Sequence, residues 1–209
     1  MSNGLTGVRA ERAQSYRALE NFAAYVRRQL DLSPDEAIDA LRLFEDLHEI
    51  KIHQGDGRVI PLWGHVKSLQ DSEGYASYDR ERRVIEIVAS EQVYEWLEEG
   101  HPRAAYFVGH ELGHCVLHTD QIIRLAKMPT NQQAAYHRGL QAHKAFEDTE
   151  WQANAFSSAL LMPAAGLAAV EVEYGYLTAS LIMEKFGVSR EAAGYRLELY
   201  NTRKGELLN

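Results

Sequence analysis

The chain has only one cysteine, Cys115, so it cannot form an internal disulfide, and this usage fits a reducing compartment. Long hydrophobic runs are also missing: no stretch of about 18 consecutive apolar residues predicts a membrane-spanning helix. Residues 1–7 lack the charged and then apolar pattern of a secretory signal sequence. We therefore expect a cytoplasmic protein that has no membrane partner.

Basic residues are scarce relative to acidic ones. Lys and Arg together number 22 and Asp and Glu 30, which gives a formal net charge of −8. Because binding to nucleic-acid phosphates requires clustered positive charge, this balance argues against a nonspecific nucleic-acid binder. At 209 residues, 45% of them hydrophobic, the chain is long enough for one sizeable core with a small appended subdomain.

The most informative motif is His110–His114, with the sequence His-Glu-Leu-Gly-His. Residues four apart lie on one face of a helix, so His110 and His114 could bind one metal ion while Glu111 reaches the attacking water. The window 104–118 contains no proline and carries spaced apolar residues, which predicts a helix. This pattern is typical of a zinc metallopeptidase.

Two glycines lie within this predicted helix. Gly109 and Gly113 each weaken a helix by up to about 1 kcal/mol relative to alanine. Such a cost is usually tolerated only where another group must approach the helix backbone closely. We therefore expect a closely packed neighbour or a substrate at these positions.

A catalytic zinc ion usually takes three protein ligands, so a third ligand must lie outside the motif. The best placed candidate is Glu150, at the start of a second predicted helix that ends before Pro163. On that helix Ala153, Asn154 and Ser157 share the face of Glu150, which suits close packing, and Asn154 could orient a ligand without binding the metal. The full set of candidates for the third ligand is His118, His137, His143, Glu147, Asp148 and Glu150.

These segments resemble a known family. His110–His114 followed by Cys-Val-Leu-His, then the pattern Glu-x-x-Ala-Asn-x-Phe from Glu150 before Leu-Leu-Met-Pro, is similar to the ImmA/IrrE family of zinc metallopeptidases. Arg103 stands where members of that family often carry arginine. The likeness is specific over about residues 83–163 and looser elsewhere. The sequence departs from the family at Ser157, where alanine is usual, and in the long segment between the two motifs.

The resemblance implies a site and an activity. His110, His114 and Glu150 would bind zinc in a gluzincin-like set, and Glu111 would be the catalytic base. Zinc would polarise the scissile carbonyl, while Glu111 would take a proton from the attacking water and pass it to the leaving amine. The implied activity is site-specific cleavage of a helix-turn-helix (XRE-type) transcriptional repressor, which derepresses stress, mobile-element or defence genes.

Some side chains near the motif have more than one interpretation. His118 could be an alternative ligand, a donor to a ligand or a packed polar residue; we favour the roles without metal binding, because its spacing does not match the metzincin pattern. Cys115 should point about 100° away from the metal-facing stripe, which favours a small buried apolar residue over a redox role. The candidates for stabilising the oxyanion, each better suited to a packing or surface role, are Tyr106, Tyr136 and His137.

Two helices and four short strands are predicted before residue 90. Residues Arg9–Arg28 form an amphipathic pattern whose arginines we expect on a solvated face. A cap serine and a capping box at Ser33 predict a helix from there to about Leu47. A small antiparallel sheet is expected, and its last strand could pair with an extended substrate or be purely structural. The predicted strands are Ile50–His53, Val59–Trp63, Gly74–Tyr78 and Arg83–Ala89.

The carboxyl-terminal region predicts a helix over Leu177–Glu184, a tight turn, and a helix over Arg190–Tyr200 capped by Ser189. It resembles a helix-turn-helix, but its second helix has only Arg190 and Arg196 as basic residues, so we favour docking or packing over DNA contact. The predicted fold class is α+β: a mainly helical, zincin-like domain with the small antiparallel sheet at 1–165, and a helix-turn-helix-like subdomain at 166–209. An alternative function is a regulatory protein that binds a repressor or DNA through 166–209 without needing proteolysis.

Overall fold

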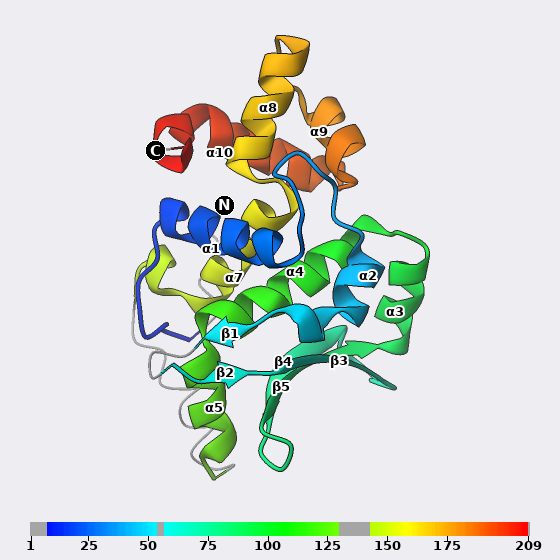
Figure 1. Cartoon of the computed structure of the whole chain (residues 1–209), viewed down its shortest axis with the longest axis vertical. Helices are drawn as coiled ribbons and strands as arrows, with labels where there is room; N and C mark the ends of the chain where they lie inside the picture. Colours follow the sequence, from blue (N-terminus) through cyan, green and yellow to red (C-terminus); the bar gives the residue numbers. More distant parts are fainter. Residues whose placement is uncertain (1–7, 54–56, 130–142, 209) are drawn as a thin grey trace.

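The computed structural model describes residues 8–53, 57–129 and 143–208. A small sheet lies at one end of the molecule, and α4 (Pro102–Leu117) crosses one of its faces (Figure 1). Next to α4 lies α7 (Thr149–Leu161), and α1 (Tyr16–Gln29) packs against α7. The last three helices, α8 (Ala164–Tyr174), α9 (Ala179–Phe186) and α10 (Arg190–Leu208), form the opposite end. This mainly helical arrangement with a small sheet confirms the predicted α+β class.

The remaining elements connect these layers. The helical ones are α2 (Ala40–Glu45), η1 (Leu47–Glu49), α3 (Glu91–Glu98), α5 (Thr119–Lys127) and η2 (Ala145–Glu147). The strands are β1 (Ile52–His53), β2 (Val59–Ile60), β3 (Leu62–Lys67), β4 (Gly74–Asp79) and β5 (Val84–Ser90).

The main sheet has the strand order β3-β5-β4, and β1 and β2 form a separate antiparallel pair. The prediction of an antiparallel sheet is wrong for one pair: β4 and β5 are antiparallel, whereas β3 and β5 are parallel. Every residue of β5 is buried, so this strand takes the middle position. The chain reverses direction between β3 and β4 and again between β4 and β5. The first and third strands of this sheet, β3 and β5, therefore run in the same direction, and they lie next to each other.

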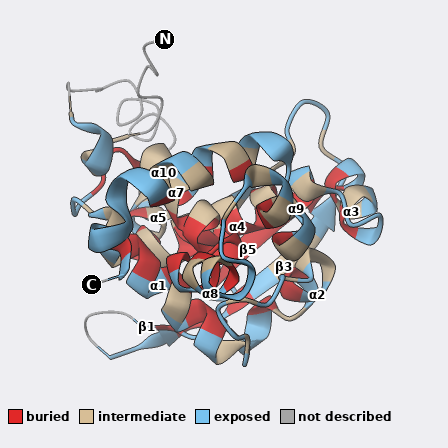
Figure 2. Ribbon diagram, turned by 90° about the horizontal axis from the view of Figure 1, so that it is seen from above, coloured by how far each residue is buried: buried red, intermediate tan, exposed pale blue. Residues whose placement is uncertain are grey.

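The two faces of β5 have different surroundings. Ile85, Ile87 and Ala89 face the helices and belong to the main hydrophobic cluster, together with Leu112 of α4 and Phe156 of α7. Figure 2 shows this buried core running through the centre of the molecule, with exposed residues around it. The sheet therefore serves as the support on which α4 is placed.

α1 begins later than predicted. Its N-cap is Ser15, whose Oγ accepts a hydrogen bond from the main-chain N–H of Ala18 at 3.2 Å. Residues 8–14 are not helical; their main chain pairs with residues 146–149 through bonds such as Ala10 N–H to Glu147 O at 2.7 Å. The amino-terminal segment is thus fixed against the residues that lead into α7.

The helix predicted from Ser33 does not form there, and α2 begins only after its own N-cap, Asp39. In residues 33–36 Glu36 Oε2 does accept from the Ser33 N–H, as in a capping box, but Ser33 Oγ donates to Asp35. Arg27 was expected on a solvated face; it is instead 2% exposed and donates to the main-chain oxygens of Ser33 and Glu36. These hydrogen bonds hold residues 33–36 in a turn, and therefore no helix follows the cap.

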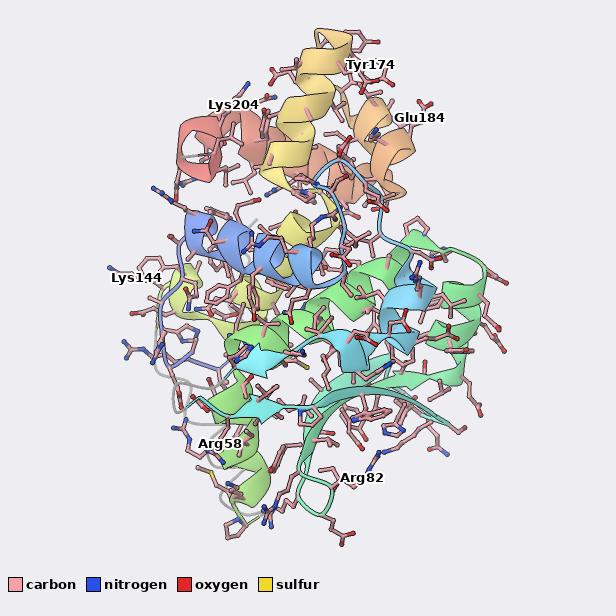
Figure 3. The ribbon with its side chains drawn as sticks, in the orientation of Figure 1. Arg58, Arg82, Lys144, Tyr174, Glu184 and Lys204 are labelled. Carbon is pink, nitrogen blue, oxygen red and sulfur yellow. The ribbon has the colours of Figure 1, made fainter. Side chains whose placement is uncertain are left out.

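The carboxyl-terminal helices contain the expected helix-turn-helix-like element. α9 ends at Gly187 in the left-handed conformation (φ 68°), and Ser189 Oγ accepts from the main-chain N–H of Ala192 as the predicted cap. These helices share a second hydrophobic cluster with Leu161 and Met162 at the end of α7. Figure 3 shows Tyr174 and Glu184 at the outer end of this layer. The predicted boundary at residue 165 falls within α8, and the division into two domains stays a prediction.

An ion pair joins this layer to the first helix. Arg196 of α10 is 1% exposed and pairs with Glu20 of α1. Its Nε also donates to the main-chain oxygen of Met162 at 2.8 Å, and Glu20 Oε2 accepts from the Ala164 N–H at 3.0 Å. The first helix, the last helix and the junction of α7 with α8 therefore meet at one buried point.

One stretch, Thr149–Tyr174, is long and apolar enough to cross a membrane by length and composition, although the sequence analysis expected none. It includes polar residues and so is not an unbroken apolar run. Within the structure 61% of its apolar window is buried, as in a core helix. This is weak support for a membrane span.

Candidate metal centre

The candidate site lies where α4 packs against α7. Residues of both helices approach closely because Gly109 and Gly113 have no side chains. A Cβ on Gly109 would lie 2.5 Å from Ser157 Oγ, and one on Gly113 would lie 3.1 Å from the Cα of Ala153. From the sequence we expected a closely packed neighbour or a substrate at these glycines, and the structure has a neighbour there, α7.

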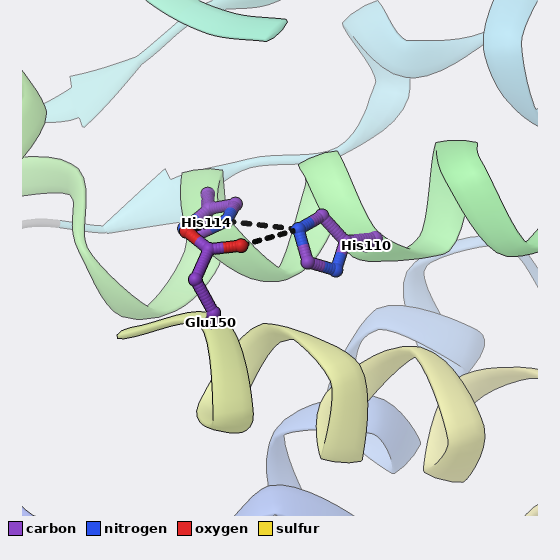
Figure 4. A group of neighbouring side chains, drawn as sticks. All are labelled: His110, His114 and Glu150. Atoms are coloured by element: carbon purple, nitrogen blue, oxygen red, sulfur yellow. Dashed lines mark hydrogen bonds and ion pairs between the residues drawn. The ribbon is translucent and has the colours of Figure 1, made fainter. Parts of the chain in front are cut away.

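His110, His114 and Glu150 converge between the two helices (Figure 4). Glu150 Oε2 lies 3.2 Å from His110 Nε2, and Glu150 Oε1 lies 3.4 Å from His114 Nε2. The two Nε2 atoms are 3.1 Å apart. One donor atom from each residue falls within 4.8 Å of the others, so the three side chains could surround a single ion.

The chemistry of these donors fits a divalent metal ion. Two imidazole nitrogens and one carboxylate form a set that zinc accepts, and manganese or iron can also bind such a set. Hydrogen bonds with His110 and His114 lower the pKa of Glu150, which keeps the carboxylate ionised. The pKa of His110 is raised, because its interactions with Glu150 and Glu111 outweigh the opposing effect of burial.

The other candidates for the third ligand lie elsewhere. Glu147 pairs with Arg9 at 3.2 Å, and Asp148 caps α7. The His143 side chain is 4% exposed and pairs with Asp148 at 2.8 Å. His118 contacts the far side of His114 and is not part of the converging group. His137 lies outside the described residues.

Glu111, the predicted catalytic base, lies beside the converging group and lines the adjacent cleft. Burial raises the pKa of its carboxyl group, while the neighbouring imidazoles of His114 and His110 act in the opposite direction. The main-chain N–H of Ala76 on β4 acts on the pKa of this carboxyl group in the same direction as the imidazoles. A raised pKa suits a group that must take up a proton near neutral pH.

β4, and not β5, is the strand that borders the site. β5 has a neighbour on each side, so both of its edges are already hydrogen-bonded. Of the two interpretations of the strand over Arg83–Ala89, the purely structural one is therefore confirmed, and pairing with a substrate is excluded for this strand. Among the described residues β4 pairs with β5 only, and the main chain of Ala76 lies near Glu111. An extended peptide would have to pair with β4 instead.

Tyr106 is the one oxyanion candidate within the described residues. Its hydroxyl donates to Asn154 Oδ1 at 3.1 Å, and burial raises its pKa to about 12. The same Asn154 Oδ1 lies 2.9 Å from His110 Nδ1, so Asn154 contacts the site as the sequence suggested. Tyr136 and His137 lie outside the described residues. Cys115 is fully buried, which agrees with the predicted packing role.

A cleft of about 1160 Å³ opens beside His110 and Glu111. Its walls come from α4, from Glu73 and Gly74 at the start of β4, from α7 and from the first turns of α10. On the α10 side Tyr195 is 68% exposed. Because pockets for small molecules usually measure about 300–1,000 Å³, this cleft has room for a peptide segment.

Comparison with known proteins gives one informative match. Residues 97–198 match the model of the family described as IrrE N-terminal-like domain, a peptidase family. No curated protein matches the chain. A solved structure described as a Mycobacterium tuberculosis transcriptional regulator aligns with 17% identity and a TM-score of 0.47, over 86% of this chain and 55% of that chain. The chain thus spans about half the length of that protein, and a likeness of this size carries no argument.

Proposed function

We propose that this chain, whose residues 97–198 match the IrrE N-terminal-like family of peptidases, is a zinc-dependent endopeptidase that cleaves a helix-turn-helix transcriptional repressor. The observation that carries the proposal is the convergence of His110, His114 and Glu150, with a peptide-sized cleft beside His110 and Glu111. Cleavage of the repressor would derepress stress, mobile-element or defence genes. We place the enzyme in the cytoplasm, where such a repressor acts.

Each residue would have a defined task. His110, His114 and Glu150 would hold zinc, which supplies a Lewis acid that polarises the scissile carbonyl and the attacking water. Glu111 would take the proton of that water and deliver it to the nitrogen of the leaving amine. The raised pKa of Glu111 makes its carboxylate a better acceptor for the proton of the water, and the more basic nitrogen of the leaving amine then takes that proton. The cleft beside α10 would hold the peptide on either side of the cut bond.

Binding of DNA through the carboxyl-terminal helices is less well supported. Of the two basic residues counted on the second helix, Arg196 is buried in its pair with Glu20 and cannot contact a phosphate. The first turns of α10, including Glu191 and Tyr195, line the cleft next to His110. These positions suit contact with a protein substrate, and they also suit the alternative in which the chain binds a repressor without cutting it.

Co-expression with a helix-turn-helix repressor encoded beside this gene, compared with the Glu111→Gln variant, would distinguish these functions. Intact-mass analysis of the repressor and metal analysis of the enzyme give the readouts. The proposal expects one zinc per chain in both enzymes and defined repressor fragments with the wild type only. An intact repressor that stays bound to both enzymes would instead support the binding function. Fragments from both enzymes would contradict the role of Glu111.

A further inference from the structure

We propose that His118 and Gln152 are positioning residues that fix the protonation pattern of His114, so that its Nε2 presents a lone pair to the metal site. The inference rests on the proposed function only in that it requires His114 to bind a metal ion. It concerns five linked groups: two main-chain carbonyls, the Gln152 amide, the His118 ring and the His114 ring. Each link determines the next.

The chain of hydrogen bonds starts at Gln152 of α7, which is 1% exposed. Its Nε2 donates to the main-chain oxygens of Arg12 and Phe146, both at 2.8 Å. Carbonyl oxygens can only accept hydrogen bonds, so the nitrogen end of the amide must face them. The oxygen end therefore points the other way, towards His118.

His118, 5% exposed, transmits this orientation to the ligand. Its Nε2 lies 3.0 Å from Gln152 Oε1, and because that oxygen can only accept, the proton must be on His118 Nε2. The Nδ1 of the neutral ring then has a free lone pair. That atom lies 3.1 Å from His114 Nδ1, which must donate to it.

This pattern leaves His114 with its proton on Nδ1 and a lone pair on Nε2. The Nε2 atom is the one that faces the site, at 3.4 Å from Glu150 Oε1 and 3.1 Å from His110 Nε2. His118 contacts the opposite edge of the ring, so it supports the ligand and does not replace it. The alternative tautomer of His114 would direct an N–H at the metal.

His110 receives separate support from α7, the helix that carries Gln152. Its Nδ1 lies 2.9 Å from Asn154 Oδ1, while its Nε2 faces Glu150. α7 therefore supplies Glu150 to the site directly, Gln152 to His114 through His118, and Asn154 to His110. These three residues stand two positions apart along one helix. Loss of a partner that orients a metal-binding histidine typically weakens metal affinity by about 10–100-fold.

The test measures zinc binding to the full-length protein, without any substrate. Gln152→Leu removes the amide, and His118→Phe keeps a ring of similar shape without its nitrogens. Competition with a chromophoric chelator should show zinc bound about 10–100-fold more weakly by each variant. The matched control is Gln121→Leu, because Gln121 is 3% exposed and its amide also donates to a carbonyl of the amino-terminal segment, that of Arg9. The control should bind zinc like the wild type.

A second readout reports the tautomer itself. Long-range ¹H–¹⁵N spectra of the metal-free protein should show His114 protonated on Nδ1 in the wild type, and a mixture of tautomers in Gln152→Leu. Wild-type zinc affinity and an unchanged His114 tautomer in both variants would overturn the inference, as would an equal loss of affinity in the Gln121→Leu control. A wild-type protein that binds no zinc would instead contradict the proposed function.

Discussion

Gly109→Ala probes the spacing between α4 and α7 on which the candidate site depends. The added Cβ would lie 2.5 Å from Ser157 Oγ and 3.3 Å from Ser157 Cβ. Ser157 is fully buried, and its Oγ donates to the main-chain oxygen of Tyr106 at 3.1 Å. The hydroxyl group therefore cannot turn away from the new methyl group without losing this hydrogen bond.

Three contributions set the expected size of the effect. Alanine in place of a helical glycine would stabilise α4 by about 1 kcal/mol. Overpacking a buried contact costs about 1–3 kcal/mol, and loss of the Ser157 hydrogen bond costs about 1 kcal/mol more. The variant should thus be destabilised by about 1–3 kcal/mol, as measured by urea unfolding of the metal-free protein. It should also bind zinc more weakly, because the same spacing brings His110 to Glu150.

Gly194→Ala in α10 is the matched control. Nothing lies within 4 Å of a Cβ at that position, so the substitution should stabilise the protein by up to about 1 kcal/mol. Adding Ser157→Ala to Gly109→Ala removes the closest contact and should recover part of the lost stability. The reasoning is refuted if Gly109→Ala alone is as stable as the wild type or more stable.

Three further predictions follow from the same structure. Arg196→Met should lower the free energy of unfolding by about 3–5 kcal/mol in urea titrations, because it leaves the Glu20 carboxylate buried and unpaired; equal stability would show that Glu20 reaches water. Removal of zinc with EDTA should lower the melting temperature of the wild type but not of Glu150→Ala, since zinc at about 1,000 times its dissociation constant adds about 4 kcal/mol to stability. Glu111→Gln should keep zinc affinity within a few-fold but reduce the rate of repressor cleavage by about 10²-fold or more, and a smaller reduction would assign the base elsewhere.

The sequence predicted well which side chains lie together at the candidate site, whereas their binding of a metal ion stays a prediction. Spacing alone places His110 and His114 on one helix face, and helix geometry plus the need for a third ligand favours Glu150. Gly109 and Gly113 were also informative, because glycine weakens a helix and is usually tolerated there only where another group approaches the backbone closely. Local patterns are informative here since each depends on residues within a few turns of one helix.

The remaining features depend on contacts between distant residues. The capping signal at Ser33 was genuine, but Arg27 from another element holds that segment as a turn. The role of Gln152 was missed altogether, because its orientation is set by the carbonyl of Arg12, 140 residues away. The parallel pairing of β3 and β5 was missed for a similar reason. The order of strands in the sheet depends on which strand is most buried, and the short turns between the strands do not reveal that order.

The ion pair of Glu20 and Arg196 has a consequence for how the chain folds during synthesis. The two residues are 176 positions apart, so the first helix must wait for nearly the whole chain to be synthesised before its carboxylate is neutralised. Until then α1 cannot bury Glu20 against α7 without leaving this carboxylate unpaired, and its docking is weakened. Because α7 carries Glu150, a chain truncated before Arg196 should hold the candidate metal centre less firmly than the full chain.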